Sequence, residues 1–212
     1  LEEFTSLGGK GAALQPHFAL EPLDALDSIS KRETCIIFDW DDTLLCSSSL
    51  GSAMPKELTL LASLARKVLE EAMNLGTVMI VTNAQPTWVK ESAGRFIPDL
   101  LPVLDKMDII SAREKQEYKH PGDYFAWKRE TFRELFTDKS LADLNLVVLG
   151  DSFAEIQAAE YLVAGDVSGA ALLKTVKFKE SPSAGELIGQ LQAMVLELQA
   201  VVAAARSVST ML

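Results

Sequence analysis

The segment CIIFDWDDTLL, residues 35–45, decides how the rest of the chain is interpreted. A short apolar run, residues 34–39, leads directly into Asp39, Asp41 and Asp42, which lie within four positions of one another. An apolar run without alternation is typical of a strand that is buried on both faces of a parallel sheet. Like charges this close repel each other, so the cluster is either a solvated turn or a site that holds a partner of opposite charge.

Strand and helix patterns alternate after this segment. Further apolar runs occupy residues 77–83, 107–111, 144–151 and 171–178. Helices are expected at 56–76, where Gly76 fits the C-terminal stop, and at 86–97, 122–136, 152–165 and about 184–205. This order predicts an α/β protein, a three-layer α/β/α Rossmann-like arrangement around a parallel sheet.

The chain divides into two unequal parts. Residues 1–33 are weakly patterned and Gly-rich, so we expect an N-terminal extension that is partly loose. Residues 34–212 are long enough to form one catalytic domain with a sizeable core. A targeting peptide, if there is one, would lie in a segment upstream of Leu1.

Composition narrows the classes of function. The net charge of −10 argues against a broad nucleic-acid surface, which needs clustered lysine and arginine. No apolar run reaches the length of a membrane span. Two cysteines, Cys35 and Cys46, do not make a disulfide framework, so we expect a reducing, intracellular compartment such as the cytoplasm.

Polar side chains follow three of the apolar runs. Asp39 and then Asp41 end the first run, Thr82 and Asn83 end the second, and Asp151 ends the fourth, with Glu155 one helical turn later, which gathers four carboxylates. Ligands of open parallel sheets bind beyond the carboxyl ends of the strands, so these groups are expected to meet there. Clustered carboxylates favour a hard cation such as Mg²⁺. Zinc is disfavoured, because neither histidine of the chain is near a strand end.

The segments DWDDT (39–43), Thr82, Lys128 and GDSFAE (150–155) resemble, in order and spacing, the four motifs of the haloacid dehalogenase superfamily. The resemblance covers roughly residues 34–180. It implies a HAD-like fold and a Mg²⁺-dependent phosphatase that works through an aspartyl-phosphate. The presence of Asp41 disfavours the dehalogenase branch, whose members lack that acid.

The resemblance also implies a role for each matching residue. Asp39 is the nucleophile, and Asp41 is the general acid and later the base. The phosphoryl group is bound by Thr82 and by Lys128, which also offsets the charge of Asp39. Asn83 fits a turn former whose N–H would also contact the phosphate. Asp151 holds Mg²⁺ together with Asp39 and the main-chain carbonyl of Asp41, and Glu155 supports the metal, often through water.

Each assignment has a plainer alternative. The aspartate cluster fits a solvated turn, and Thr82 fits a β-branched strand residue. Ser152 and Glu155 have the spacing of a capping box, in which Glu155 would bond the backbone instead of supporting a metal. Lys128 could be a solvated helical lysine, with Lys115 or Lys119 of the preceding loop in its place.

Neither position at which the superfamily inserts a cap holds enough residues for one. Residues 44–76 contain a short loop and one helix, and 111–123 is a loop with a basic spot made of Arg113, Lys115, Lys119 and His120. We therefore expect a capless protein with an open site, which Trp40 lines. An open site suits a phosphorylated macromolecule, or a small molecule if a neighbouring subunit forms a lid.

The sequence allows alternatives for the last helix and for the function. The last helix is expected to pack on the sheet, while its far end, VVAAARSVSTML (201–212), either frays or serves a homodimer. The alternatives to a phosphatase are a catalytically weak binding or scaffold protein of the same fold, and a nucleotide-specific hydrolase or phosphotransferase.

Overall fold

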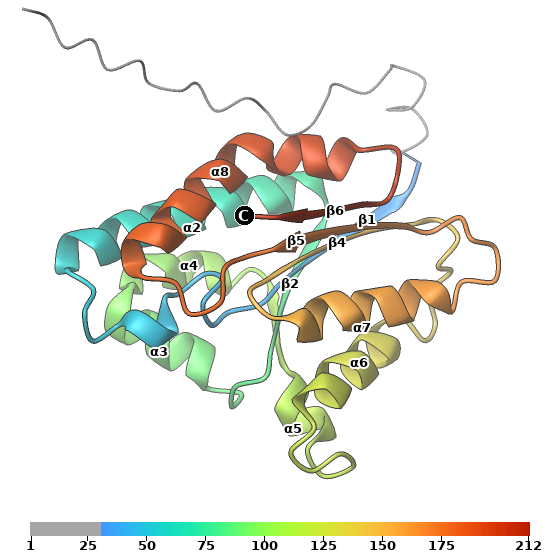
Figure 1. Cartoon of the computed structure of the whole chain (residues 1–212), viewed down its shortest axis with the longest axis horizontal. Coiled ribbons are helices and arrows are strands. Elements are labelled where there is room, and N and C mark those ends of the chain that lie inside the picture. Colours follow the sequence, from blue (N-terminus) through green and yellow to red (C-terminus); the bar gives the residue numbers. More distant parts are fainter. Residues whose placement is uncertain (1–30) are drawn as a thin grey trace, which may run out of the picture.

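A computed structural model describes residues 31–212, and the expected extension over residues 1–33 lies almost wholly outside this part. Six parallel strands form one sheet in the order β3-β2-β1-β4-β5-β6 (Figure 1). The strands are β1 Glu33–Phe38, β2 Thr77–Thr82, β3 Asp108–Ser111, β4 Leu144–Gly150, β5 Leu172–Lys177 and β6 Val208–Met211.

Helices cover both faces of the sheet. One face carries α2 Pro55–Leu75, α3 Trp88–Phe96, α4 Leu101–Leu104 and α8 Ala184–Ala203. The other carries α6 Tyr124–Leu135 and α7 Phe153–Ala164, with the short α5 Ala112–Gln116 beside α6. Two short 3₁₀ turns, η1 Ser47–Ser49 and η2 Pro98–Leu100, complete the described chain.

The first strand explains why the sequence lacks alternation. Ile36 and Phe38 belong to the apolar cluster under α2 and α8, whereas Cys35 and Ile37 belong to the cluster under α6 and α7. All four side chains are buried, because successive residues of a strand point to opposite faces and both faces are covered. The predicted three-layer α/β architecture is therefore confirmed, and the described residues contain no separate cap domain.

Close approach of backbones fixes the turn between α2 and β2. Gly76 is the C-cap of α2, as its position in the sequence predicted. A β-carbon at this position would lie 2.5 Å from the carbonyl oxygen of Thr34 in β1. The turn thus sits against the sheet, and only a glycine fits without displacing β1.

The C-terminal segment differs from the expectation. The chain leaves α8 after Ala203, and residues 208–211 form β6, which pairs with β5 at the edge of the sheet. Val201, Val202 and Ala204 are buried, so the far end of the helix neither outruns the core nor frays. The segment VSTM is too short and too polar to predict a strand, because its pairing partner β5 provides most of the reason for it to be extended.

Among residues 31–212, α8 is the one helix long and apolar enough to cross a membrane by length and composition. It packs against α2, and its buried residues, among them Leu187, Leu191, Met194 and Leu198, belong to the main apolar cluster. A core helix has this composition for the same reason as a membrane span, since both exclude water.

Candidate functional site

The carboxyl end of β1 places Asp39 between its two neighbouring strands. β1 pairs with β2 on one side and β4 on the other, and the main-chain N–H of Asp39 still donates to the carbonyl of Leu149, at 2.9 Å. The side chain of Asp39 is buried. Asp151 follows the end of β4 directly and is close enough to influence the pKa of Asp39. The sheet therefore brings together the ends of the first and fourth apolar runs, as predicted.

Lys128 reaches this edge from α6 and is fully buried. Its Nζ donates to Oδ1 of Asp39 at 2.7 Å and to Oε1 of Glu155 at 2.6 Å. Asp123 caps the N-terminus of α6 by accepting from the N–H of Ala126 at 2.9 Å, which fixes where the helix begins.

The loop lysines do not take the place of Lys128. Lys115 and Lys119 lie 3.7 Å and 3.5 Å from the carboxylate of Glu134, on the partly exposed side of α6. Arg113 pairs with Glu117 at 2.8 Å. The expected basic spot is thus largely neutralised by its own acidic neighbours.

Burial dominates the electrostatics of the aspartates. It raises the pKa of Asp39 to about 8, although Lys128 acts in the opposite direction, and Glu155 and Asp151 raise it further. Burial likewise raises the pKa of Asp151 to about 7, with Glu155 and Asp42 adding to the effect. One buried lysine is therefore too little positive charge for the carboxylates around it, and a cation would lower both pKa values.

Lys128 remains charged in this environment. Burial alone would lower the pKa of its ammonium group, but the carboxylates of Asp39 and Glu155 outweigh that effect and raise it. A charged lysine beside the aspartate would offset part of the repulsion that an approaching anionic substrate meets.

Glu155 holds the lysine in position. Its Oε2 accepts from the hydroxyl of Ser152 at 2.8 Å while its Oε1 accepts from Lys128. The capping box considered from the sequence is not formed, since Ser152 accepts from the N–H of Ala154 instead. A β-carbon at Gly150 would lie 2.8 Å from Cγ of Glu155, so the close approach of this side chain requires glycine.

The side chains of Asp41 and Asp42 have different hydrogen-bond partners after the end of β1. Oδ1 of Asp41 accepts from Nε1 of Trp88 at 2.8 Å and from the hydroxyl of Ser47. Asp42 has a φ of 54° and accepts from the N–H of Ser48 at 2.9 Å. A left-handed backbone explains why glycine would suit this position, and aspartate is among the few other residues that tolerate it. Asp42 therefore lies in a turn, as the alternative interpretation expected, but its side chain is buried instead of solvated.

Trp40 does not line the site, contrary to the expectation. It is fully buried among the apolar residues under α2, and its Nε1 donates to Oγ of Ser92 at 3.0 Å. Trp88 takes the place beside Asp41 instead. Sequence reasoning missed it because the two residues are 47 positions apart and no motif joins them.

The end of β2 contributes Thr82 and Asn83. Oγ1 of Thr82 accepts from the N–H of Ala84 at 3.0 Å, which shapes the turn after the strand. Nδ2 of Asn83 donates to the carbonyl of Tyr124 at 3.1 Å and so ties this turn to the start of α6. The side-chain oxygen of Asn83 is buried without a hydrogen-bond partner within residues 31–212.

The expected cluster of four carboxylates is not formed. Within residues 31–212 no three or more aspartate, glutamate, histidine or cysteine side chains converge on one metal position. Asp41 is engaged by Trp88 and Ser47, and Glu155 by Lys128 and Ser152. Asp151 and the second oxygen of Asp39, whose Oδ1 accepts from Lys128, remain at neighbouring strand ends, and carboxylate oxygens are ligands of the kind that Mg²⁺ prefers.

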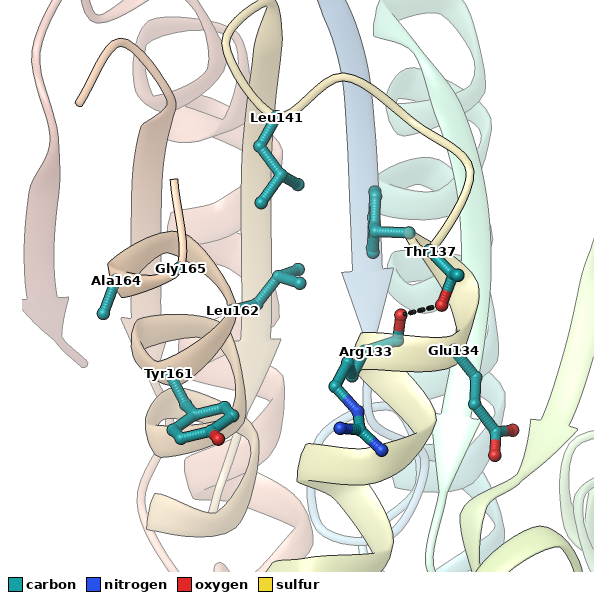
Figure 2. A pocket seen from close by; sticks show the side chains of 9 residues that line it. Arg133, Glu134, Thr137, Leu141, Tyr161, Leu162, Ala164 and Gly165 are labelled. Atoms are coloured by element: carbon teal, nitrogen blue, oxygen red, sulfur yellow. Dashed lines mark hydrogen bonds between the residues drawn. The ribbon is translucent and has the colours of Figure 1, made fainter. Parts of the chain in front are cut away.

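A surface cavity of the described part lies elsewhere. It has a volume of about 790 Å³ and lies between the C-terminal ends of α6 and α7 (Figure 2). Two of its polar groups have partners: the hydroxyl of Thr137 donates to the carbonyl of Arg133 at 2.9 Å (Figure 2), and Glu134 accepts from Gln116 at 2.7 Å. The cavity contains no group poised for chemistry.

Comparison with known proteins adds little. No protein-family model matches the chain, and no curated protein matches it significantly. A solved structure with some similarity is the C-domain of a bacterial malonyl-CoA reductase with NADP, at 11% identity and a TM-score of 0.41. The match covers 96% of this chain and 39% of that one, so the chain spans about two fifths of that protein. A likeness this slight carries no argument about activity.

Proposed function

We propose that the protein is a Mg²⁺-dependent phosphatase of the haloacid dehalogenase type that hydrolyses phosphate monoesters through an aspartyl-phosphate on Asp39. The observation that carries the proposal is the contact of 2.7 Å between Lys128 and the buried Asp39 at the carboxyl edge of the sheet. A buried lysine–aspartate pair costs free energy through desolvation, so its presence at a ligand edge favours a functional role.

Asp39 would act first. Lys128 engages its Oδ1, so Oδ2 is the oxygen suited to attack phosphorus. The new P–O bond forms while the ester P–O bond breaks, and the leaving oxygen takes a proton from Asp41. Water then attacks the same phosphorus, Asp41 accepts a proton from that water, and inorganic phosphate leaves as Asp39 is regenerated.

The remaining residues bind and orient. Lys128 would offset charge on Asp39 and on the phosphoryl oxygens, while Thr82 and the N–H of Asn83 would donate to those oxygens. Glu155 would hold Lys128 in position rather than contact the substrate. Bound by Asp39, Asp151 and the Asp41 carbonyl, Mg²⁺ would supply charge neutralisation and orientation of the phosphoryl group.

Replacement of Asp39 by asparagine tests the proposal. Asp39→Asn keeps the size and hydrogen-bonding shape of the side chain but removes the nucleophilic charge. We expect hydrolysis of a generic aryl phosphate in Mg²⁺ to fall about 10⁴-fold or more. Asp105→Asn, in an exposed pair with Lys90, is the matched control and keeps full activity. Turnover that survives in Asp39→Asn would remove Asp39 as the nucleophile.

A binding or scaffold protein is the second candidate. Lys128 bridges Asp39 and Glu155, an arrangement that a protein without turnover could also keep. It would bind a phosphorylated partner without consuming it, which the same assay separates from hydrolysis.

A further inference from the structure

We propose that Trp88, Tyr124 and Phe153 form an aromatic rim around the site, and that this rim selects phosphate esters whose leaving group is an aromatic ring. The proposal rests on the phosphatase function, because the rim is placed relative to Asp39 and Asp41. The three side chains come from three segments that start at the carboxyl edge of the sheet: the starts of α3, α6 and α7.

Phe153 stands beside the proposed metal ligand. It is the first residue of α7, two positions after Asp151, and half of its surface is exposed. Nζ of Lys177 lies 4.9 Å from the centre of its ring, and the same Nζ donates to the main-chain carbonyl of Asp151. The ring is thereby held next to Asp151 although it contributes nothing to the core.

Tyr124 stands beside the lysine. It precedes Lys128 by one helical turn, so both side chains lie on the same face of α6. Its main-chain carbonyl accepts from Asn83, and its ring packs 4.9 Å from the ring of Phe125. Tyr124 remains 54% exposed, so an aromatic surface lies at the start of α6, beside the turn that holds Asn83.

Trp88 stands beside the proposed general acid. Its indole N–H donates to Oδ1 of Asp41 at 2.8 Å, while its ring is partly buried against the core. The leaving oxygen of a substrate must meet Asp41 to be protonated, so the group bonded to that oxygen lies close to the indole. Of the three rim residues, Trp88 is therefore the one nearest to the departing alcohol.

Chemistry of the rim favours a planar apolar group. Residues 31–212 include no cap domain, so within this part of the chain selectivity has to come from contacts along an open surface. Aromatic faces pair with one another more favourably than their buried area alone explains. Exposed phenylalanine and tyrosine at the starts of two neighbouring helices would gain these contacts from an aryl ester and little from a short alkyl ester.

Binding of non-hydrolysable phosphonates tests the rim separately from catalysis. Calorimetry in Mg²⁺ compares phenylphosphonate with methylphosphonate, whose phosphorus–carbon bonds survive the enzyme. We expect the native protein to bind the phenyl compound about tenfold more tightly, and Phe153→Ala and Tyr124→Ala each to reduce that preference about 2- to 10-fold. Tyr161→Ala is the matched control, since Tyr161 is similarly exposed but lies more than two turns further along α7.

The outcomes separate the two proposals. A preference below about twofold in the native protein, or no binding of either phosphonate, overturns the rim even if alkyl phosphates are hydrolysed. A phenyl preference that Phe153→Ala removes upholds the rim, even if no phosphate ester is turned over and the phosphatase function fails. Phe153→Leu keeps the apolar bulk without the ring and decides the matter if Phe153→Ala does not fold.

Discussion

The two ends of the helix pair α6 and α7 differ in whether their charged side chains are buried or exposed. At the N-terminal ends, Lys128, Asp39 and Glu155 are buried in contact with one another, and none of them lines the cavity of Figure 2. At the C-terminal ends, a cavity of about 790 Å³ is surrounded by partly exposed ion pairs such as that between Lys119 and Glu134. Buried charge is costly and exposed pairs are nearly neutral, so charge locates the site better than concavity does.

Removal of the buried lysine should have the largest effect on stability and so tests the contrast between the two ends first. Lys128→Met keeps the length of the stem but leaves Asp39 and Glu155 without their shared cation. We expect the free energy of unfolding at pH 7 to fall by about 3–5 kcal/mol, measured by urea denaturation. Glu134→Gln, which removes the partner of Lys115 and Lys119 at the cavity end, should cost less than about 1 kcal/mol. Equal losses in the two variants would contradict the contrast.

The second test is the pH dependence of stability, which should originate at the buried end. The pKa of Asp39 is raised to about 8 and that of Asp151 to about 7, whereas both lose their protons near pH 4 in the unfolded chain. Between those values the folded state binds more protons, so without divalent cations stability should fall as pH rises from about 4 to about 8. Glu186, with a pKa lowered to about 2, acts only below that range.

Thermal unfolding between pH 5 and 8 in a chelator measures this slope. Asp39→Asn removes one of the two titrations and should flatten the curve, and Mg²⁺ should flatten it in the native protein by lowering both pKa values. A slope that neither change affects would place its origin elsewhere in the molecule.

A single methyl group at Gly150 gives the smallest of these effects. Gly150→Ala would push a β-carbon to 2.8 Å from Cγ of Glu155 and displace the side chain that holds Lys128. We expect a loss of about 1–3 kcal/mol in the free energy of unfolding, together with reduced turnover. Gly189→Ala, inside α8 with no atom within 4 Å of the added carbon, should instead gain up to about 1 kcal/mol. A gain at both positions would mean that Glu155 is not closely packed.

The buried strands of the sheet could be predicted because their signal is local. The runs 34–39, 77–83 and 144–151 became β1, β2 and β4 to within a residue, since each is buried on both faces. Edge strand β6 and the short α5 could not, because β5 and α6 supply the contacts that stabilise them. The composition of a short segment does not reveal which distant strand or helix will stabilise it.

The residues of the candidate site could be predicted in part. Strand-end position identified Asp39 and Asp151, and motif spacing selected Lys128, which the fold brings against Asp39. The carboxylate of Asp41 instead meets Trp88, and that of Glu155 meets Lys128. Those contacts depend on how loops and helices pack around the sheet edge, which spacing along the chain does not encode.

Melting of the protein with Mg²⁺ and beryllium fluoride tests the central claim most directly, because this fluoride mimics a phosphoryl group bonded to an aspartate. At concentrations about 100-fold above its dissociation constant, the complex should stabilise the native protein by about 2.7 kcal/mol, more than Mg²⁺ or fluoride alone. The stabilisation should disappear in Asp39→Asn. No shift with both reagents, or the same shift in Asp39→Asn, would contradict an aspartyl-phosphate on Asp39.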